Sequence, residues 1–292
     1  MENTPSTSVN SSDSSIATGV GLTALVTAAL RAVETNTGDP LIDDPFAAQF
    51  VRCANPENPL PVRLADVDRD DDRTLLKFAA DGMALRTRYL DDHLLGSGAA
   101  QVVILAAGLD TRAFRLGWPQ GCTVFEMDQQ SVLEFKQDAL DQAGARPRCD
   151  RRTVPVDLRE DWAAALVAAG FDQTRPTAWL AEGLLPYLSP AEEERLFDLV
   201  HKLSAPGSSI AVWAMAQDAR GADQRLSSMY ATFGVQMTSV TNTEPRRNIV
   251  DHLPSLGWAV TENTIAELAE RYHRPPSSSR RRISLFTARY PA

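Results

Sequence analysis

The chain from residue 100 onward alternates between short apolar runs and amphipathic stretches. The apolar runs have the length and the Val, Ile and Leu content of buried strands. We expect strands at 101–106, 123–127, 152–156, 177–181 and 209–215. Between them, apolar positions recur at helical spacing. We expect helices at 131–142, 161–169 and 190–203. This alternation predicts an α/β fold, in which a doubly wound, mostly parallel sheet carries helices on both faces.

The C-terminal third adds two strands and an irregular segment. Strand patterns at 258–262 and 283–290 bring the predicted sheet to seven strands, with the last one antiparallel at an edge. Residues 217–248 form a long insertion after the fifth strand, whose apolar positions Met229, Tyr230, Phe233 and Met237 recur at helical spacing. They fit core packing or a lid over a site at the strand ends, and we favour the lid.

The N-terminal part reads as a polar tail followed by helices. Residues 1–15 are rich in Ser, Thr and Asn and are expected to be disordered. Residues 16–98 are expected to form a helical cap on a core of residues 99–292. Asp44 is the predicted N-cap of one cap helix, with Pro45 at its first position. The apolar stretch 16–33 resembles a signal sequence, but no basic residue precedes Arg31. It is also too short to span a bilayer.

Composition narrows the possible partners. The net charge of −9 disfavours nucleic acid as a partner. The basic clusters 246–247 and 280–282 read as solvated loop arginines. Three cysteines without a CxxC motif argue against a disulfide framework and a zinc site, and suit the cytoplasm. The alternating acids 66–70 lack the glycine and glutamate of a calcium loop, so no metal is predicted.

Acidic residues recur at the ends of successive predicted strands. In such a sheet, ligands bind at the carboxyl ends of the strands. The residues at these ends are Gly108 and Asp110, then Glu126 and Asp128, then Asp157, then Glu182. Gly108 would let the backbone approach a ligand closely. A carboxylate after the second strand could accept both hydroxyls of a ribose, and Asp157 with Leu158 could bind adenine.

The loop after the first strand distinguishes between two nucleoside cofactors. A dinucleotide loop needs GxGxxG so that a pyrophosphate can bind the helix N-terminus. Here Gly108 is followed by Leu109 and Asp110, and an aspartate would repel a pyrophosphate. It suits the ammonium and sulfonium of S-adenosyl-L-methionine (SAM) better than NAD(P). Arg86, at the border of an apolar helix stripe, could hold the carboxylate of SAM or form a structural ion pair.

Four motifs, "AAGLDTRAFRL", "VFEMDQQSVLEFK", "VPVDLREDW" and "WLAEGLLPYLS", carry a resemblance to a known family. Together they resemble the leucine carboxyl methyltransferase-like family of SAM-dependent enzymes, and more closely its actinobacterial branch of O-methyltransferases. The resemblance covers nearly all of the chain after the polar tail. It implies a class I methyltransferase fold, which is Rossmann-like. Ala106 departs from the wider family, where glycine often begins the loop.

The resemblance also implies which residues contact SAM. The implied contacts are Arg86, Gly108, Asp128, Asp157 and Leu158, with Glu182 lining the site. Glu126 is the alternative to Asp128 for the ribose, and we prefer Asp128 because it lies nearer the crevice.

The expected activity is methyl transfer to a carboxylate or hydroxyl of a small molecule. A hydroxyl acceptor would need a base, for which Glu182 and Tyr187 are candidates, although Tyr187 could equally pack below the loop. The four histidines do not lie at strand ends. The alternatives are an NAD(P)-dependent oxidoreductase and a non-catalytic SAM- or partner-binding protein.

Overall fold

The computed structural model describes residues 19–215, 230–234, 242, 244–275 and 283–291. The predicted polar tail 1–15 lies outside these residues, as do most of the predicted insertion 217–248 and the basic cluster 280–282. In the part of the chain that is described, no helix is long and apolar enough to cross a membrane.

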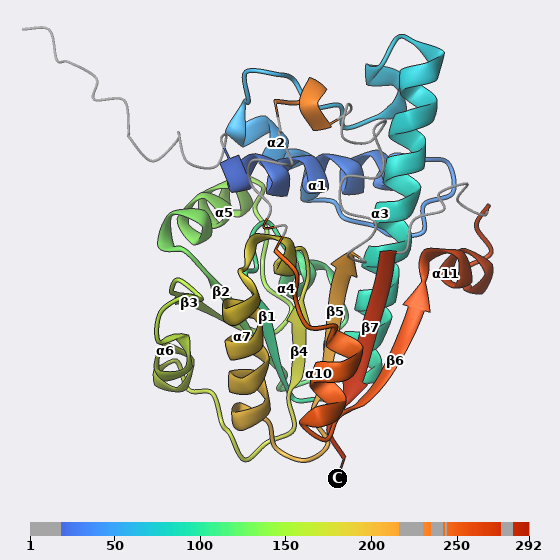
Figure 1. The fold of residues 1–292 in the computed structure, drawn as a ribbon. Coiled ribbons are helices and arrows are strands. Elements are labelled where there is room, and N and C mark those ends of the chain that lie inside the picture. Colours follow the sequence, from blue (N-terminus) through green and yellow to red (C-terminus); the bar gives the residue numbers. More distant parts are fainter. Residues whose placement is uncertain (1–18, 216–229, 235–241, 243, 276–282, 292) are drawn as a thin grey trace, which may run out of the picture.

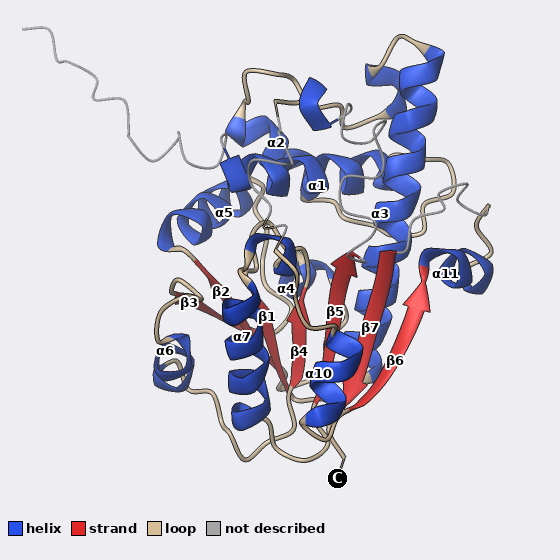
Figure 2. Ribbon diagram, viewed as in Figure 1, coloured by secondary structure: helices blue, strands red, loops and turns tan. Residues whose placement is uncertain are grey.

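The core is one seven-stranded sheet with the order β3-β2-β1-β4-β5-β7-β6 (Figures 1 and 2). Its strands are β1 (Gln101–Leu105), β2 (Thr123–Asp128), β3 (Asp150–Pro155), β4 (Ala178–Ala181), β5 (Ser209–Met215), β6 (Ala259–Thr264) and β7 (Ile283–Arg289). The first five strands pair in parallel, whereas β7 is antiparallel to both β5 and β6. This topology confirms the predicted fold class.

The last strand corrects one expectation, because β7 lies inside the sheet and β6 takes the edge. The side chains of β6 and β7 explain why β7 lies inside the sheet and β6 at its edge. Leu285, Phe286 and Ala288 of β7 are buried, and a strand between two neighbours needs such residues. None of the β6 residues is buried and the last four are polar, and polar residues protect an edge from pairing with another chain.

Helices cover both faces of the sheet, and each face has its own apolar core. One core involves α6 (Trp162–Ala168), α7 (Pro190–Leu203) and α10 (Ile249–Ser255). The other involves α1 (Gly19–Thr35), α3 (Asp70–Gly96), α5 (Gln130–Gln142) and α11 (Ile265–Arg271). The first turn of α7 is closed by a reciprocal pair of hydrogen bonds between Ser189 and Glu192, as its sequence predicts.

A helical cap lies across the carboxyl ends of the parallel strands (Figure 1). It contains α1, α2 (Ala47–Ala54), the short helix η1 (Leu64–Asp66) and α3. Asp44 closes the turn that leads into α2, because its Oδ1 accepts a hydrogen bond from the Phe46 amide at 3.2 Å, as expected of a capping residue. Its Oδ2 also accepts hydrogen bonds from Arg31 and Thr111, each at 2.8 Å, and the helix proper begins at Ala47. The cap thus places α1 and α3 over the strand tips, where the predicted site residues converge.

Candidate functional site

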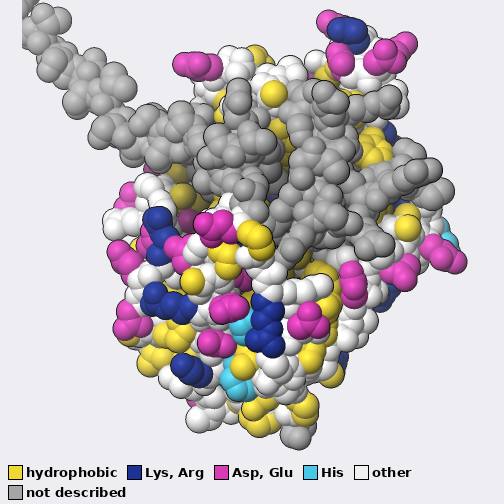
Figure 3. All heavy atoms as spheres, viewed as in Figure 1, with side chains coloured by type: hydrophobic (Ala, Val, Ile, Leu, Met, Phe, Trp, Pro, Cys, Tyr) yellow, Lys and Arg dark blue, Asp and Glu magenta, His cyan; other side chains and the backbone are white. Residues whose placement is uncertain are grey.

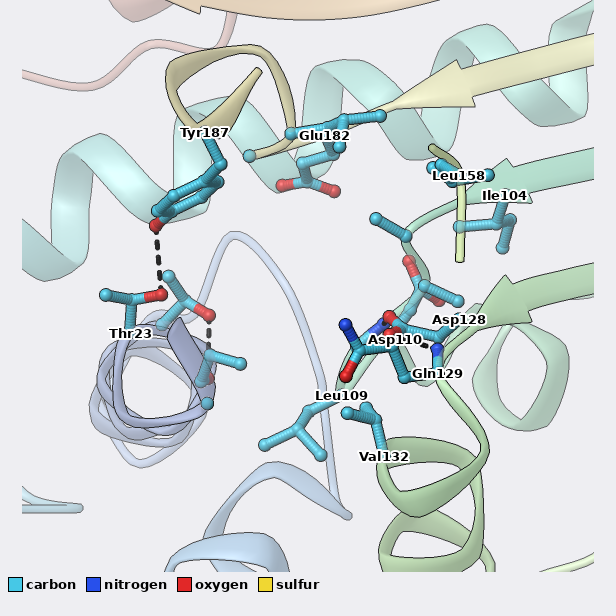
Figure 4. A pocket seen from close by; sticks show the side chains of 18 of the residues that line it. Thr23, Ile104, Leu109, Asp110, Asp128, Gln129, Val132, Leu158, Glu182 and Tyr187 are labelled. Carbon is cyan, nitrogen blue, oxygen red and sulfur yellow. Dashed lines mark hydrogen bonds between the residues drawn. The ribbon is translucent and has the colours of Figure 1, made fainter. Parts of the chain in front are cut away.

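A cavity of about 570 Å³ opens between the cap and the strand tips (Figure 4). This volume is within the usual range for a small-molecule site. The predicted site residues that line it are Arg86, Gly108, Asp110, Asp128, Asp157, Leu158, Glu182 and Tyr187. The structure therefore brings together residues from β1, β2, β3 and β4 with Arg86 of α3.

The loop after β1 forms one wall of the cavity. Gly108 has a positive φ of +45°, and an added Cβ would lie 3.9 Å from its nearest neighbours, so the conformation rather than the space favours glycine. Ala106, where the wider family often has glycine, also has a positive φ of +49°. The loop therefore keeps a left-handed geometry at this position at a cost of about 1–2 kcal/mol.

Asp128 holds this loop from the tip of β2. Its Oδ2 accepts a hydrogen bond from the Gly108 amide at 2.7 Å, and its Oδ1 accepts one from the Gln129 amide at 2.7 Å. Burial raises the pKa of this carboxyl above its ordinary value, against the lowering effect of the two amide hydrogen bonds. Asp128 thus faces the cavity with a partly desolvated carboxylate.

Glu126 is not brought to the cavity. Its side chain is completely buried two residues earlier on β2, where Oε2 lies 2.8 Å from Nζ of Lys136 and 2.7 Å from Nη2 of Arg151. Glu126 and Asp128 share a face of the strand, but Glu126 lies beneath α5 and binds its lysine. Of the two carboxylates weighed for the ribose, only Asp128 is in position for this role.

Glu182, at the tip of β4, is held between two arginines. Its Oε1 accepts from Nε of Arg86 at 2.5 Å, and its Oε2 accepts from Nη1 of Arg112 at 2.8 Å. Burial acts to raise the pKa of Glu182, but the charges of Arg86 and Arg112 overcome it and lower the pKa to about 2. Glu182 is therefore a permanent anion at neutral pH.

Arg112 links the loop aspartate to a second buried acid. Its guanidinium pairs with Asp110 in the loop and with Asp91 of α3, at 2.7 Å from the latter. Asp91 also binds Arg115 at 2.6 Å. The charge of Asp110 at the cavity is thus balanced by Arg112, and both Arg112 and Arg115 are almost fully buried. Sequence reasoning missed Arg112, because two of its three acidic partners, Asp91 and Glu182, are 21 and 70 positions away.

Asp157 and Leu158 follow β3 at the far end of the cavity. The Asp157 carboxylate accepts two hydrogen bonds from the Arg159 guanidinium, at 2.5 and 2.9 Å. The hydrogen bonding with Arg159 lowers the pKa of Asp157. Leu158 contributes an apolar side chain beside it (Figure 4).

Tyr187 closes the cavity from the short helix η2 (Leu185–Tyr187). Its hydroxyl donates to Thr23 Oγ1 of α1 at 2.9 Å (Figure 4). Burial raises its pKa above the ordinary value of 10. Thr23, Thr27 and Arg31 of α1 also line the cavity and were not predicted. Their spacing of four residues along an otherwise apolar helix is the signal that could have found them.

The comparisons with known proteins agree with this geometry. A profile of leucine carboxyl methyltransferases matches residues 24–201. The chain belongs to the leucine carboxyl methyltransferase family. A relative from Mycolicibacterium gilvum, named as a candidate SAM-dependent methyltransferase, is 47% identical over 274 residues, covering 89% of each chain. A similarly named relative from Saccharopolyspora erythraea is 45% identical, covering 90% of this chain and 91% of its own.

Solved structures support the same fold. A candidate methyltransferase from Thermobifida fusca superimposes with a TM-score of 0.55 at 16% identity, covering 97% of this chain and 98% of the other. As a member of the leucine carboxyl methyltransferase family, this protein is a SAM-dependent methyltransferase. The NAD(P) and non-catalytic alternatives are set aside. The part of the chain that is described contains no group of acidic, histidine or cysteine residues suited to a metal.

Proposed function

We propose that this methyltransferase transfers the methyl group of SAM to a carboxylate oxygen of a small molecule, forming a methyl ester. The observation that carries the proposal is the protonation state of the groups around the cavity. Glu182 is held ionised by two arginines, and its pKa of about 2 makes it too weak a base to deprotonate an alcohol. The pKa of Tyr187 is raised, so its hydroxyl stays protonated at neutral pH.

The histidines do not supply a general base for a hydroxyl acceptor either. None of His93, His201, His252 and His273 lines the described wall of the cavity. Among the other acids there, Asp110 and Asp157 face arginines at short range. Asp128 gives both carboxylate oxygens to the amides of Gly108 and Gln129, which oppose the rise of its pKa on burial. A hydroxyl acceptor needs a base with a pKa near neutrality, whereas a carboxylate is already an anion at that pH. A site without such a base therefore suits a carboxylate.

The residues around the cavity also fit SAM itself. Asp128 is positioned to accept the ribose hydroxyls, and Asp157 with Leu158 to bind the adenine. Gly108 lets the loop approach the cofactor, and Asp110 and Glu182 present negative charge toward its ammonium and sulfonium. Arg86 is the candidate partner for its carboxylate, since its guanidinium has donors beyond the one given to Glu182.

When bound, SAM supplies a methyl group already activated by its sulfonium. The residues of the chain then have to align the acceptor oxygen with that methyl group and exclude water. Tyr187 of η2 and Thr23 of α1 lie opposite the loop and are the polar groups best placed to orient the acceptor. Arginines around the cavity favour an anionic acceptor by their charge.

The test is a paired screen with tritium-labelled methyl SAM. Each aliphatic or aromatic carboxylic acid is offered beside the alcohol of the same skeleton, and the products are treated with alkali. Methyl esters release volatile labelled methanol under alkali, whereas methyl ethers do not. We expect label in base-labile products from acids alone, and none with Asp128→Ala. Base-stable label from alcohols would overturn the carboxylate proposal.

A further inference from the structure

Arg246 lies outside the cavity but binds the turn that carries Tyr187. Its side chain is 4% exposed, which corrects the expectation of a solvated loop arginine. Nη1 donates to the carbonyl oxygen of Leu185 at 2.8 Å, and Nη2 donates to that of Leu188 at 3.1 Å. One guanidinium thus binds the backbone on both sides of Tyr187.

Asn242 extends this contact to the residue between. Its backbone amide donates to the carbonyl oxygen of Pro186 at 2.7 Å. Nη2 of Arg246 also donates to the Asn242 carbonyl and side-chain oxygens, each at 3.3 Å. Residues 242 and 246 together bind three carbonyl oxygens of the turn 185–188.

Glu193 of α7 is the ion-pair partner of Arg246. Its Oε2 lies 2.5 Å from Nη1, and the Glu193 side chain is 8% exposed. A planar guanidinium with several fixed donors holds a geometry that a lysine cannot reproduce. Because the pair is buried, loss of either partner leaves an uncompensated charge beside the turn. The contact is therefore strong and directional.

We propose that Arg246 is a positioning residue, which holds the turn 185–188 so that the Tyr187 hydroxyl points into the cavity at Thr23. Its importance for acceptor binding rests on the proposed function. The positioning of the turn does not rest on the proposed function, because it follows from the hydrogen bonds of Arg246 alone. The adjacent Arg247 is exposed and donates only to the Asp251 carbonyl oxygen, at 3.2 Å, among the contacts described. It is a matched control of the same chemistry.

The experiment follows the Tyr187 phenol directly. Protein labelled with ¹³Cζ-tyrosine is titrated by NMR, the Tyr187 signal is assigned with Tyr187→Phe, and S-adenosylhomocysteine is present throughout. In the wild type we expect the phenol to titrate above pH 10, because it is buried. In Arg246→Ala the phenol becomes exposed and its titration moves down toward 10. In Arg247→Ala it stays where it is in the wild type.

Hydrogen exchange gives the second measurement. The amides of Tyr187 and Leu188 donate to the carbonyls of Leu184 and Leu185, so their exchange reports the order of the turn. We expect exchange in a peptide spanning 184–188 to rise by about tenfold or more in Arg246→Ala, with peptides of β1 unchanged. An unchanged titration and unchanged exchange in a folded Arg246→Ala protein would overturn the proposal.

Two further variants cover the case in which Arg246→Ala fails to fold. Glu193→Gln keeps the volume of the partner and weakens its hold on Arg246, and Glu194→Gln is its neighbour control. The same two measurements should change in Glu193→Gln and not in Glu194→Gln, and equal behaviour of the two would count against the proposal. No methyl acceptor is used, so an error in the proposed acceptor would not affect this result.

Discussion

Arg86 and Glu182 are 96 positions apart in sequence, yet the Nε of the first lies 2.5 Å from the Oε1 of the second. Arg86 belongs to the cap helix α3, and Glu182 stands at the tip of β4 in the core. The Arg86 guanidinium also lies over the Trp213 ring of β5, 4.5 Å from its centre. The pair therefore joins cap and sheet at the wall of the cavity, and the carboxylate that makes this link also lines the cavity.

Replacing this carboxylate by Glu182→Gln should lower the free energy of unfolding by about 3 kcal/mol at pH 7, since buried Arg86 loses its ion pair and Arg112 loses one of its three acidic partners. The pKa of Glu182 is about 2 in the folded protein, below its ordinary 4.5. The contribution of the ionised Glu182 to the free energy of unfolding is therefore complete above pH 4.5 and is lost as the pH falls through 2.

Urea unfolding of wild type and Glu182→Gln from pH 3 to 8 measures this difference. It should be constant above pH 5 and shrink at lower pH. Glu134→Gln, at an exposed position of α5, is the control and should change little. A difference that grows on acidification would show that Glu182 is not held ionised by the arginines.

Asp128 and Glu126 should give opposite results, although only one residue separates them. Asp128→Ala should weaken S-adenosylhomocysteine binding about 10- to 100-fold, through loss of charged hydrogen bonds worth about 1.5–3 kcal/mol. Glu126→Gln should lower stability by about 3–5 kcal/mol, because Lys136 and Arg151 lose a completely buried partner. It should leave binding nearly unchanged wherever the protein is folded.

Calorimetric titration and thermal unfolding of the two variants test this contrast. Aspartate-to-asparagine substitution at 128 provides a milder change at the same position. If Glu126→Gln lost binding while Asp128→Ala kept it, the assignment of the ribose contact would have to be reversed.

The pH dependence of methyl transfer separates a carboxylate from a hydroxyl acceptor. With a carboxylate, kcat/KM should be flat between about pH 6 and 9, because the acceptor is already ionised and Glu182, with a pKa of about 2, keeps its charge across that range. With a hydroxyl, the rate should rise with the ionisation of a base. Stopped assays over this range, using saturating SAM and an acceptor from the paired screen, make the measurement. A rising limb with a midpoint near pH 7 would point to a base.

Ala106 offers a test of backbone strain at the cofactor loop. Its φ is +49°, which glycine adopts at little cost. Ala106→Gly should therefore leave stability unchanged or raise it by up to about 1 kcal/mol, because relief of strain offsets the added freedom of the unfolded chain. Ala107→Gly, at a buried neighbour without a positive φ, should lower stability by about 1 kcal/mol. Thermal unfolding of both variants measures the two changes in stability. An equal loss of stability in the two variants would refute strain at Ala106.

Local patterns in the sequence predicted much of this protein. The start of α7 follows from Ser189, Pro190 and Glu192, which act within one turn, and strands β1, β4 and β5 follow from continuous apolar runs. The site residues at the strand tips could also be found, because a parallel sheet brings such tips to one edge. Each of these inferences needs only neighbours in sequence or a rule about topology.

The expectations that changed concern polar residues whose partners are distant in sequence. Asp44 accepts the Phe46 amide at the entry to α2, as its sequence context predicts, but its second oxygen also binds Thr111, which is 67 positions away. Arg246 follows a loop pattern, yet Glu193 and three backbone carbonyl oxygens take it out of solvent. The position of Glu126 near the end of β2 is compatible with a ribose contact in sequence, but in the structure Glu126 is buried against Lys136 of α5. A single sequence gives no sign of these pairings, since they depend on how the layers pack.

Charged side chains of both signs are interspersed over the described surface in Figure 3, so the face shown there carries no extended basic patch. Of the arginines at the cavity, Arg159 is exposed, whereas Arg31, Arg86, Arg112 and Arg115 are largely buried and paired. The field that an acceptor meets is therefore set inside the cleft and changes little with bulk salt, since buried pairs are screened weakly.

The cavity takes its floor from loops of the sheet and its roof from α1. Thr23, Thr27 and Arg31 of that single helix face the loops that hold Gly108, Asp128 and Glu182. Arg31 also donates to the carbonyl oxygen of Leu109 at 2.8 Å, so the helix above and the loop below are joined by a direct hydrogen bond. A substitution along this stripe of α1 would therefore change the shape of the cavity, and at Arg31 it would change the support of the loop as well.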